Sequence, residues 1–225
     1  MDNILLIETS TALCSVALAQ DGVVTSYRES SAPKAHASLT AVFIQEMLAE
    51  RGLTLADCDA ICVSKGPGSY TGLRVGVSTA KGLCLGSGKP LLAVGTLDTL
   101  VAQADEIGGI KYIIPMIDAR RMEVYTAVFE NGVQITETSP MIIDETSFAE
   151  YLEQGPCLFI GDGAGKCADV IKHPNAQFCQ CWPKASAMLV PAMAAYKEKR
   201  FEDVAYFEPF YLKEFVATVS KKKLW

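Results

Sequence analysis

Apolar and polar positions in the first hundred residues predict an α/β domain that begins with three strands. In chain order the predicted elements are strands at 4–7, 15–20 and 23–28, a helix at 37–51, a strand at 60–64, a helix at 72–86 and a strand at 91–94. The strands show short apolar runs bounded by turn residues, and the helices show longer mixed stretches. An Asp21-Gly22 pair predicts a tight turn between the second and third strands.

The second half of the chain repeats this order. Its predicted elements are strands at 112–117, 123–130 and 133–137, a helix at 145–153, a strand at 157–160 and a helix at 164–172. Asn131-Gly132 repeats the Asx-Gly turn, and Gly108-Gly109 interrupts the helix that begins after Thr96. We therefore predict two duplicated domains, at 1–103 and 104–225. The last predicted helix, at 185–200, either stays with the second domain or crosses back to the first.

The duplicated pattern resembles the actin, hexokinase and heat-shock ATPase (ASKHA) superfamily, in which each domain has a mixed sheet flanked by helices. In that superfamily ATP lies between the domains and its phosphates meet the first hairpin turns. The resemblance implies a cleft that contains Glu8, Thr9, Ser10, Gly66, Gly68, Ser69, Asp118, Arg120, Gly161 and Gly163. Neither hairpin turn contains glycine, so side chains would crowd the phosphates and the cleft is expected to be vestigial.

Composition and charge narrow the class of protein. Half of the 225 residues are apolar and a fifth are charged, which is typical of a globular protein. The acidic N-terminus and the short apolar run at 4–7 do not resemble a signal or membrane segment, so we expect a cytoplasmic protein. The net charge of -6 excludes a polyanion-binding field over the whole surface. Lys221 to Lys223 form either a solvated basic tail or an auxiliary RNA contact.

The eight cysteines do not indicate disulfides or a metal centre. Several of them lie in apolar runs, where a free thiol packs as a small hydrophobe, so we expect a reducing compartment. Zinc sites need paired CxxC motifs or clustered histidines. His173, Cys179 and Cys181 form the one candidate group, and we predict no metal.

Four segments resemble the TsaB (YeaZ) family and keep that family's order. They are ILLIETSTALCSVAL at 4–18, KGPGSYTGLRVGVSTAKGL at 65–83, IDARRMEVYTAVF at 117–129 and EPFYLKEFVAT at 208–218. The resemblance implies a non-catalytic scaffold in the bacterial machinery that makes threonylcarbamoyladenosine beside the anticodon of tRNAs reading codons that begin with A. It implies pairing with the metal-binding catalytic paralogue TsaD, joined by the ATPase TsaE, and contact with tRNA mainly through that complex.

The same resemblance bears on cofactors and chemistry. The catalytic paralogue carries a His-x-x-x-His metal pair, and alignment places Thr96 and Leu100 at those two positions. Leu100 offers no lone pair to a metal, so we assign no catalytic residue to this chain. We expect it to have no cofactor of its own and ATP, ADP and metal to be bound by the partners. Whether nucleotide also lies near the shared interface stays open.

A protein without catalytic residues must act through a binding surface, and the helices at 37–51 and 72–86 are the candidates for that surface. The first is apolar over more than one face, and the second carries four glycines that weaken an isolated helix. A surplus apolar arc fits either a core or a partner helix, and in the absence of the paralogue the same surface could pair with itself in a homodimer. The predicted interface residues are Leu39, Phe43, Met47, Gly72, Val75, Gly76, Thr79 and Leu83.

Two enzymatic interpretations stay open at this point. The first is an active ATP-dependent phosphoryl or acyl transferase of the same superfamily, in which Glu8 and Asp118 would hold magnesium. The second is a peptidase with Ser69 or Cys84 as the nucleophile, although neither histidine is close to them in sequence to act as the base.

Overall fold

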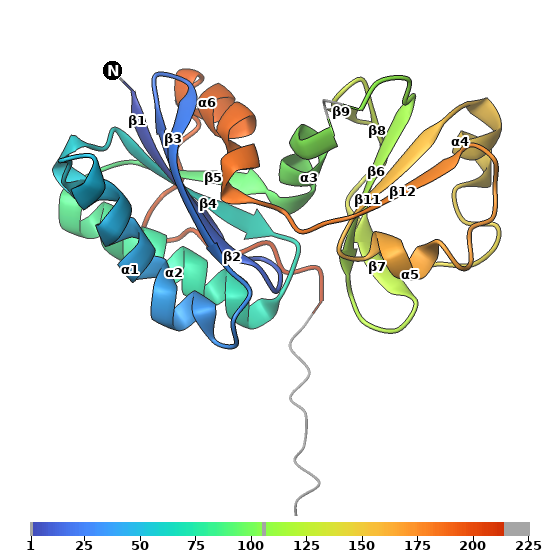
Figure 1. The fold of residues 1–225 in the computed structure, drawn as a ribbon, viewed down its shortest axis with the longest axis horizontal. Coiled ribbons are helices and arrows are strands. Elements are labelled where there is room, and N and C mark those ends of the chain that lie inside the picture. Colours follow the sequence, from blue (N-terminus) through green and yellow to red (C-terminus); the bar gives the residue numbers. More distant parts are fainter. Residues whose placement is uncertain (1, 105–106, 214–225) are drawn as a thin grey trace, which may run out of the picture.

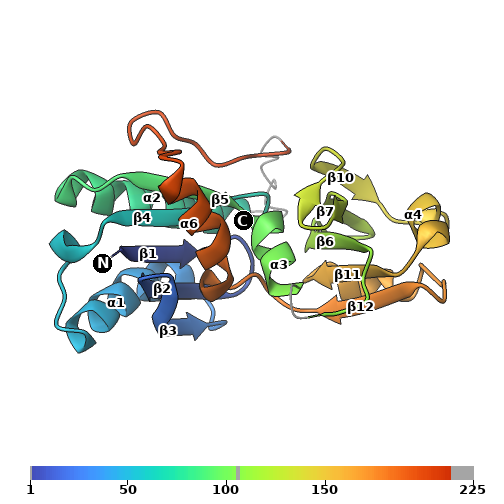
Figure 2. The same ribbon diagram turned by 90° about the horizontal axis from the view of Figure 1, so that it is seen from above.

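The computed structural model describes residues 2–104 and 107–213 (Figure 1). It consists of two α/β lobes that lie side by side, with helix α3 (Thr96–Ala104) between them (Figure 2). Among the described helices, none combines the length and the apolar character needed to span a membrane.

The first lobe is built on a five-stranded mixed sheet. Its strands are β1 (Asn3–Glu8), β2 (Cys14–Gln20), β3 (Val23–Ser30), β4 (Ala60–Gly66) and β5 (Leu91–Gly95). The strand order is β3-β2-β1-β4-β5. The first three strands pair antiparallel, and β1, β4 and β5 pair parallel. Successive side chains of β1 alternate between two apolar clusters, one on each face of the sheet.

Helices cover both faces of this sheet. Helices α1 (Ala35–Glu50) and α2 (Tyr70–Ser87) pack on one face, and the short helix η1 (Leu55–Asp57) lies between α1 and β4 in the chain. Helices η2 (Ala185–Met188) and α6 (Leu189–Lys197) pack on the other face. The helix predicted at 185–200 therefore crosses back to the first lobe, because its alanine-rich face fits closely against the sheet.

The second lobe repeats the strand order and directions of the first. Its strands are β6 (Tyr112–Asp118), β7 (Glu123–Thr126), β10 (Ser139–Ile142), β11 (Cys157–Gly161) and β12 (Ala176–Gln180), with a side hairpin of β8 (Phe129–Glu130) and β9 (Val133–Gln134). The main order is β10-β7-β6-β11-β12. Helices α4 (Ala149–Gln154) and α5 (Ala164–Cys167) lie on one face, and α3 packs on the other.

Four predicted elements of the second lobe are wrong in extent, and one of them is the strand predicted at 123–130, which is divided into β7 and β8. The strand predicted at 133–137 contributes only β9 to the side hairpin, and β10 takes its place in the main sheet. Between β7 and β8, the Val128 N–H donates to the Thr136 hydroxyl at 2.8 Å and the Val128 carbonyl accepts the Ile135 N–H at 2.8 Å. Helix α4 starts four residues later than predicted, at Ala149, and α5 ends at Cys167.

The segment after α6 returns along the first lobe, and we call residues 201–213 the C-terminal strap. Glu202 forms an antiparallel bridge with Leu91 at the edge of the sheet. Lys81 on α2 donates to the carbonyl oxygens of Ala205 and Phe207, each at 3.1 Å. The strap ends between the two lobes.

Candidate functional site

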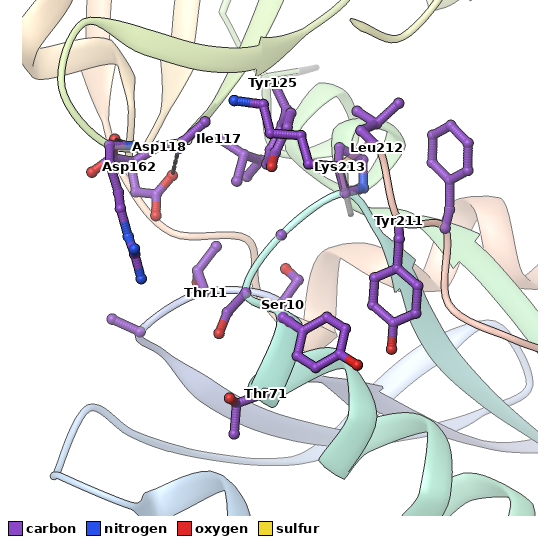
Figure 3. A pocket seen from close by; sticks show the side chains of 18 of the residues that line it. Ser10, Thr11, Thr71, Ile117, Asp118, Tyr125, Asp162, Tyr211, Leu212 and Lys213 are labelled. Atoms are coloured by element: carbon purple, nitrogen blue, oxygen red, sulfur yellow. Dashed lines mark hydrogen bonds between the residues drawn. The ribbon is translucent and has the colours of Figure 1, made fainter. Parts of the chain in front are cut away.

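A cleft of about 730 Å³ lies between the lobes where four segments meet (Figure 3). It is lined by residues 10–12 of the first hairpin turn, 67–71 at the start of α2, 117–120 of the second hairpin turn and 210–213 of the strap, together with His36, Tyr125 and Asp162. Ser10, Gly68, Ser69, Asp118 and Arg120 were expected here and do line the cleft.

The start of α2 packs directly on the first hairpin turn. A Cβ atom on Gly68 would collide with the Ser10 carbonyl oxygen, and one on Gly72 would collide with the carbonyl oxygen of Thr9. The Ser69 N–H donates to the Ser10 carbonyl at 2.6 Å, and the Ser69 hydroxyl caps the helix by accepting the Gly72 N–H at 3.3 Å. The glycines of this loop therefore serve close packing.

Glu8 and Thr9 do not line the cleft, and their assignment to it was wrong. Both side chains are fully buried behind the turn. Burial raises the pKa of the Glu8 carboxyl from 4.5 to about 7, opposed by hydrogen bonding to Ser10, whose N–H donates to Oε1 at 2.7 Å. A carboxyl that is buried behind the turn does not face a metal ion in the cleft.

Two hydroxyl groups at the floor of the cleft have no hydrogen-bond partner among the described residues. Ser10 is 0% and Thr11 is 5% exposed, and Oγ of Ser10 and Oγ1 of Thr11 are both unpaired. Both side chains lie on the floor in Figure 3. Buried polar atoms normally find a partner, so this floor suits a ligand or water that hydrogen-bonds to hydroxyls.

The second hairpin turn is held by a lysine from α5. Nζ of Lys166 pairs with Asp118 and donates to the carbonyl oxygens of Arg121 and Glu123, each at 2.7 Å. The Arg120 backbone has φ 73° and its N–H donates to Oδ1 of Asp118 at 2.8 Å. Since Lys166 already neutralises Asp118 and Glu8 is buried, these residues do not fit the magnesium ion that the transferase interpretation requires.

Gly66, Gly161 and Gly163 also lie outside the cleft, contrary to expectation. Gly66 has φ 108° and adjoins the carbonyl oxygen of Phe210 in the strap. Gly161 has φ 134° and packs on the Met116 carbonyl, and Gly163 packs on Val124. The 161–167 loop is therefore a tight strand-to-helix turn. Its Asp162 does line the cleft, and burial raises the pKa of that carboxyl to about 6.

The predicted interface residues divide into two groups. Met47, Gly72 and Gly76 are buried within the lobe, so they cannot face a partner. Five others are half-buried along α1 and α2, namely Leu39, Phe43, Val75, Thr79 and Leu83. The apolar periodicity of α1 did not separate these groups because apolar residues surround most of the helix.

Beside the half-buried residues, the outer surfaces of α1 and α2 carry exposed apolar and small residues among polar ones such as Glu46 and Arg74. Val42 is 42% exposed and Leu85 is 82% exposed. Gly82 and Gly86 are exposed, and a Cβ atom on either would meet no other atom within 4 Å. The α1/α2 face, which we define as these two apolar residues, these two glycines and the five half-buried residues, can accept a closely packed helix.

The positions aligned with the paralogue's metal pair are buried. Thr96 and Leu100 are both 0% exposed, and Leu100 packs in the apolar cluster that joins α3 to the second sheet. Among residues 2–104 and 107–213, no three His, Cys, Asp or Glu side chains gather closely enough to hold a metal, including His173, Cys179 and Cys181. All eight cysteines are free thiols.

The peptidase interpretation finds no nucleophile. Cys84 is buried in the core, which raises the pKa of its thiol to about 11. The Ser69 hydroxyl is committed as a helix cap. His36 does line the same cleft, but its Nε2 lies 2.9 Å from the Thr11 carbonyl oxygen and must donate to it.

Sequence reasoning missed several cleft residues that come from the strap and from aromatic positions. Tyr70, Tyr125, Tyr211 and Lys213 all line the cleft. Each lies within a segment that carries the TsaB resemblance, and that resemblance was the one signal in the sequence that pointed to them. The basic run at 221–223 lies outside the described residues.

Comparison with known proteins agrees with the fold and with the quoted segments. Residues 23–221 match the family model described as TsaD, tRNA N6-adenosine threonylcarbamoyltransferase. The Escherichia coli tRNA threonylcarbamoyladenosine biosynthesis protein TsaB is 33% identical, over 95% of this chain and 96% of that protein. The solved structure of YeaZ from Pseudomonas aeruginosa superposes with a TM-score of 0.81 at 28% identity and covers 94% of this chain and 100% of its own.

A more distant structure supports the ASKHA-like fold alone. It is the activator of the 2-hydroxyisocaproyl-CoA dehydratase from Clostridium difficile, with a TM-score of 0.52 at 9% identity over 88% of this chain and 96% of its own. The predicted α/β fold class is thereby confirmed.

Proposed function

Since the chain belongs to the TsaB family of tRNA threonylcarbamoyladenosine biosynthesis proteins, we propose that it acts in this biosynthesis as a non-catalytic scaffold. In this role it pairs through its α1/α2 face with the catalytic paralogue TsaD, and the ATPase TsaE joins the pair. Metal and nucleotide belong to those partners, and tRNA is bound mainly by the complex.

The observation that carries the proposal is the α1/α2 face. Val42 on α1 and Leu85 on α2 are exposed, and the α2 glycines Gly82 and Gly86 face open space, a combination that costs stability in a free monomer. Burial of apolar surface against a partner contributes roughly 25 cal/mol per Å², and glycine allows two helices to approach closely. A matching α1/α2 pair on a paralogue of the same fold would supply such a surface.

The cleft supports the non-catalytic part of the proposal. Glu8 is buried away from it, Asp118 is paired with Lys166, and Leu100 occupies a position where the paralogue has a metal ligand. A transferase of the superfamily would need a free carboxylate for magnesium at one of the hairpin turns. The transferase alternative therefore lacks the groups that its chemistry requires in this chain.

A reconstituted modification assay tests the proposal. The chain, TsaD, TsaE, an enzyme that supplies the threonylcarbamoyl donor, ATP and an unmodified tRNA are combined, and each protein is omitted in turn. We expect no modification without this chain and no turnover of ATP or tRNA by this chain alone. Modification that proceeds at the same rate in its absence, or turnover by the isolated chain, would overturn the proposal. If the isolated chain forms a homodimer through the same face, that homodimer should dissociate when TsaD is added.

A further inference from the structure

Aromatic rings and basic side chains lie together along one rim of the cleft, and the group extends beyond the lining residues to Arg74 on α2. The rings of Tyr70 and Tyr211 lie 4.9 Å apart between centroids, tilted by 37°. The guanidinium of Arg74 lies 5.4 Å from the Tyr70 ring centroid, and Nη1 donates to the Tyr70 hydroxyl at 3.0 Å. These contacts join α2 to the strap. We call Arg74, Tyr70, Tyr211, Lys213, Tyr125 and Arg120 the aromatic-basic rim.

The rim continues across the cleft to the second lobe. Nζ of Lys213 lies 6.0 Å from the ring centroid of Tyr125 and pairs with Glu123. Figure 3 shows Tyr125 and Lys213 together on one wall and Tyr211 beside them on the strap. Three aromatic rings and three basic side chains thus come from α2, the strap and the second hairpin.

The charge along the rim favours an anionic ligand. Asp118 and Glu123 are each neutralised by a lysine, whereas Arg74 and Arg120 form no ion pair with any described carboxylate. Two carboxyl groups oppose this balance, because Glu208 acts electrostatically on Tyr211 and Asp162 lines the same cleft. Tyr211 keeps 37% of its surface exposed, which leaves ring surface available for stacking.

Stacking surfaces interleaved with cations are the means by which proteins bind single-stranded nucleic acid. We propose that the aromatic-basic rim binds an unpaired RNA loop, with a base stacked on Tyr211 and phosphates at Arg74 and Arg120. The inference rests on the proposed function, because the proposed complex would bring a tRNA loop close to this chain. The net charge of -6 makes such binding weak and sensitive to salt.

Fluorescence anisotropy with a labelled anticodon stem-loop RNA tests the inference on the isolated full chain. We expect the stem-loop to bind more tightly than a blunt duplex of equal length. Two phosphate contacts predict a slope of about -1.4 for log K against log salt, and Arg74→Ala should reduce it to about -0.7. Tyr211→Ala should weaken binding by about tenfold through lost stacking.

Matched variants give the controls. Arg51→Ala removes an exposed arginine outside the cleft, and Tyr206→Ala removes a tyrosine that is 85% exposed and also outside it. Both should bind as the wild type does. Absence of stem-loop binding at low salt, or equal losses from rim and control variants, would overturn the inference.

A variant with Lys221, Lys222 and Lys223 changed to alanine separates the tail from the rim. Binding that disappears in this variant but survives Arg74→Ala unchanged would also overturn the inference. Each variant is tested in parallel for co-purification with TsaD. If the chain binds RNA through the aromatic-basic rim but does not pair with TsaD, the result contradicts the proposed function and supports RNA binding by the rim.

Discussion

The carbonyl oxygen of Thr9 occupies the space that a Cβ atom on Gly72 would need, so at Gly72 the backbone of α2 rests directly on the backbone of the first hairpin turn. Because the colliding atom belongs to the backbone, it cannot move aside as a flexible side chain would. The contact fixes the start of α2, and with it Ser69 and Tyr70 in the cleft.

Gly72→Ala should therefore destabilise the fold by about 1–3 kcal/mol, the usual cost of overpacking. Gly82→Ala is the matched control, because Gly82 lies in the same helix and faces open space. It should stabilise the chain by about 1 kcal/mol through helix propensity. Urea unfolding of both variants measures the difference, and equal stabilities would show that the packing described for Gly72 is wrong.

Glu8 should make stability depend on pH. The folded carboxyl keeps its proton up to about pH 7, whereas the unfolded one loses it near 4.5. The free energy of unfolding is therefore highest below pH 4.5 as far as this group is concerned, and it falls by about 3 kcal/mol as the pH rises from 4.5 to 7. Above pH 7 it stays at the lower value.

Glu8→Gln removes this titration while it keeps the shape of the side chain. The stability of the variant relative to the wild type should increase between pH 5 and 7 and then remain constant, by about 3 kcal/mol in total. Unfolding curves recorded in steps of pH give this difference directly. A difference that does not change with pH would mean that the carboxyl is ionised in the folded protein.

Lys166 should hold the second hairpin turn in its folded conformation. Lys166→Met removes the partner of Asp118 and two hydrogen bonds to the turn carbonyls, so we expect a loss of about 1–3 kcal/mol. Arg120 and Arg121 in this turn should then be cut faster by trypsin. Lys172→Met serves as control, since the Lys172 side chain is 70% exposed and forms one hydrogen bond, to the Ala168 carbonyl, and a long ion pair, neither of which reaches the turn. Equal trypsin rates in the two variants would contradict this role.

The first lobe was largely predictable from sequence because its central strands are buried and therefore apolar. β1, β2 and β4 are short apolar runs between turn residues, and α2 has a serine cap and a glycine end near its predicted limits. The second lobe was harder because its third strand, β10, is mostly exposed and carries a proline, so it lacks the alternation that marked Val133 to Glu137.

The candidate site was less predictable than the fold. Sequence placed Glu8 in the cleft because it ends a strand beside the turn, but its side chain turns into the core. It placed Gly76 at the interface because a glycine ridge fits either a partner or the core, and here Thr9 fills that space. The strap shows no periodicity, so only the family resemblance indicated its importance.

The α1/α2 face is the central claim, and the affinity of this chain for TsaD tests it most directly. Val42→Asp places a charge on that face, and Val190→Asp places one at a 65% exposed valine of α6, on the opposite face of the first sheet. Both should fold, because both valines contact solvent. By titration calorimetry, Val190→Asp should bind TsaD like the wild type, and Val42→Asp should bind about tenfold or more weakly, since its charge would be desolvated without a partner. Equal affinity of the two folded variants would contradict the account.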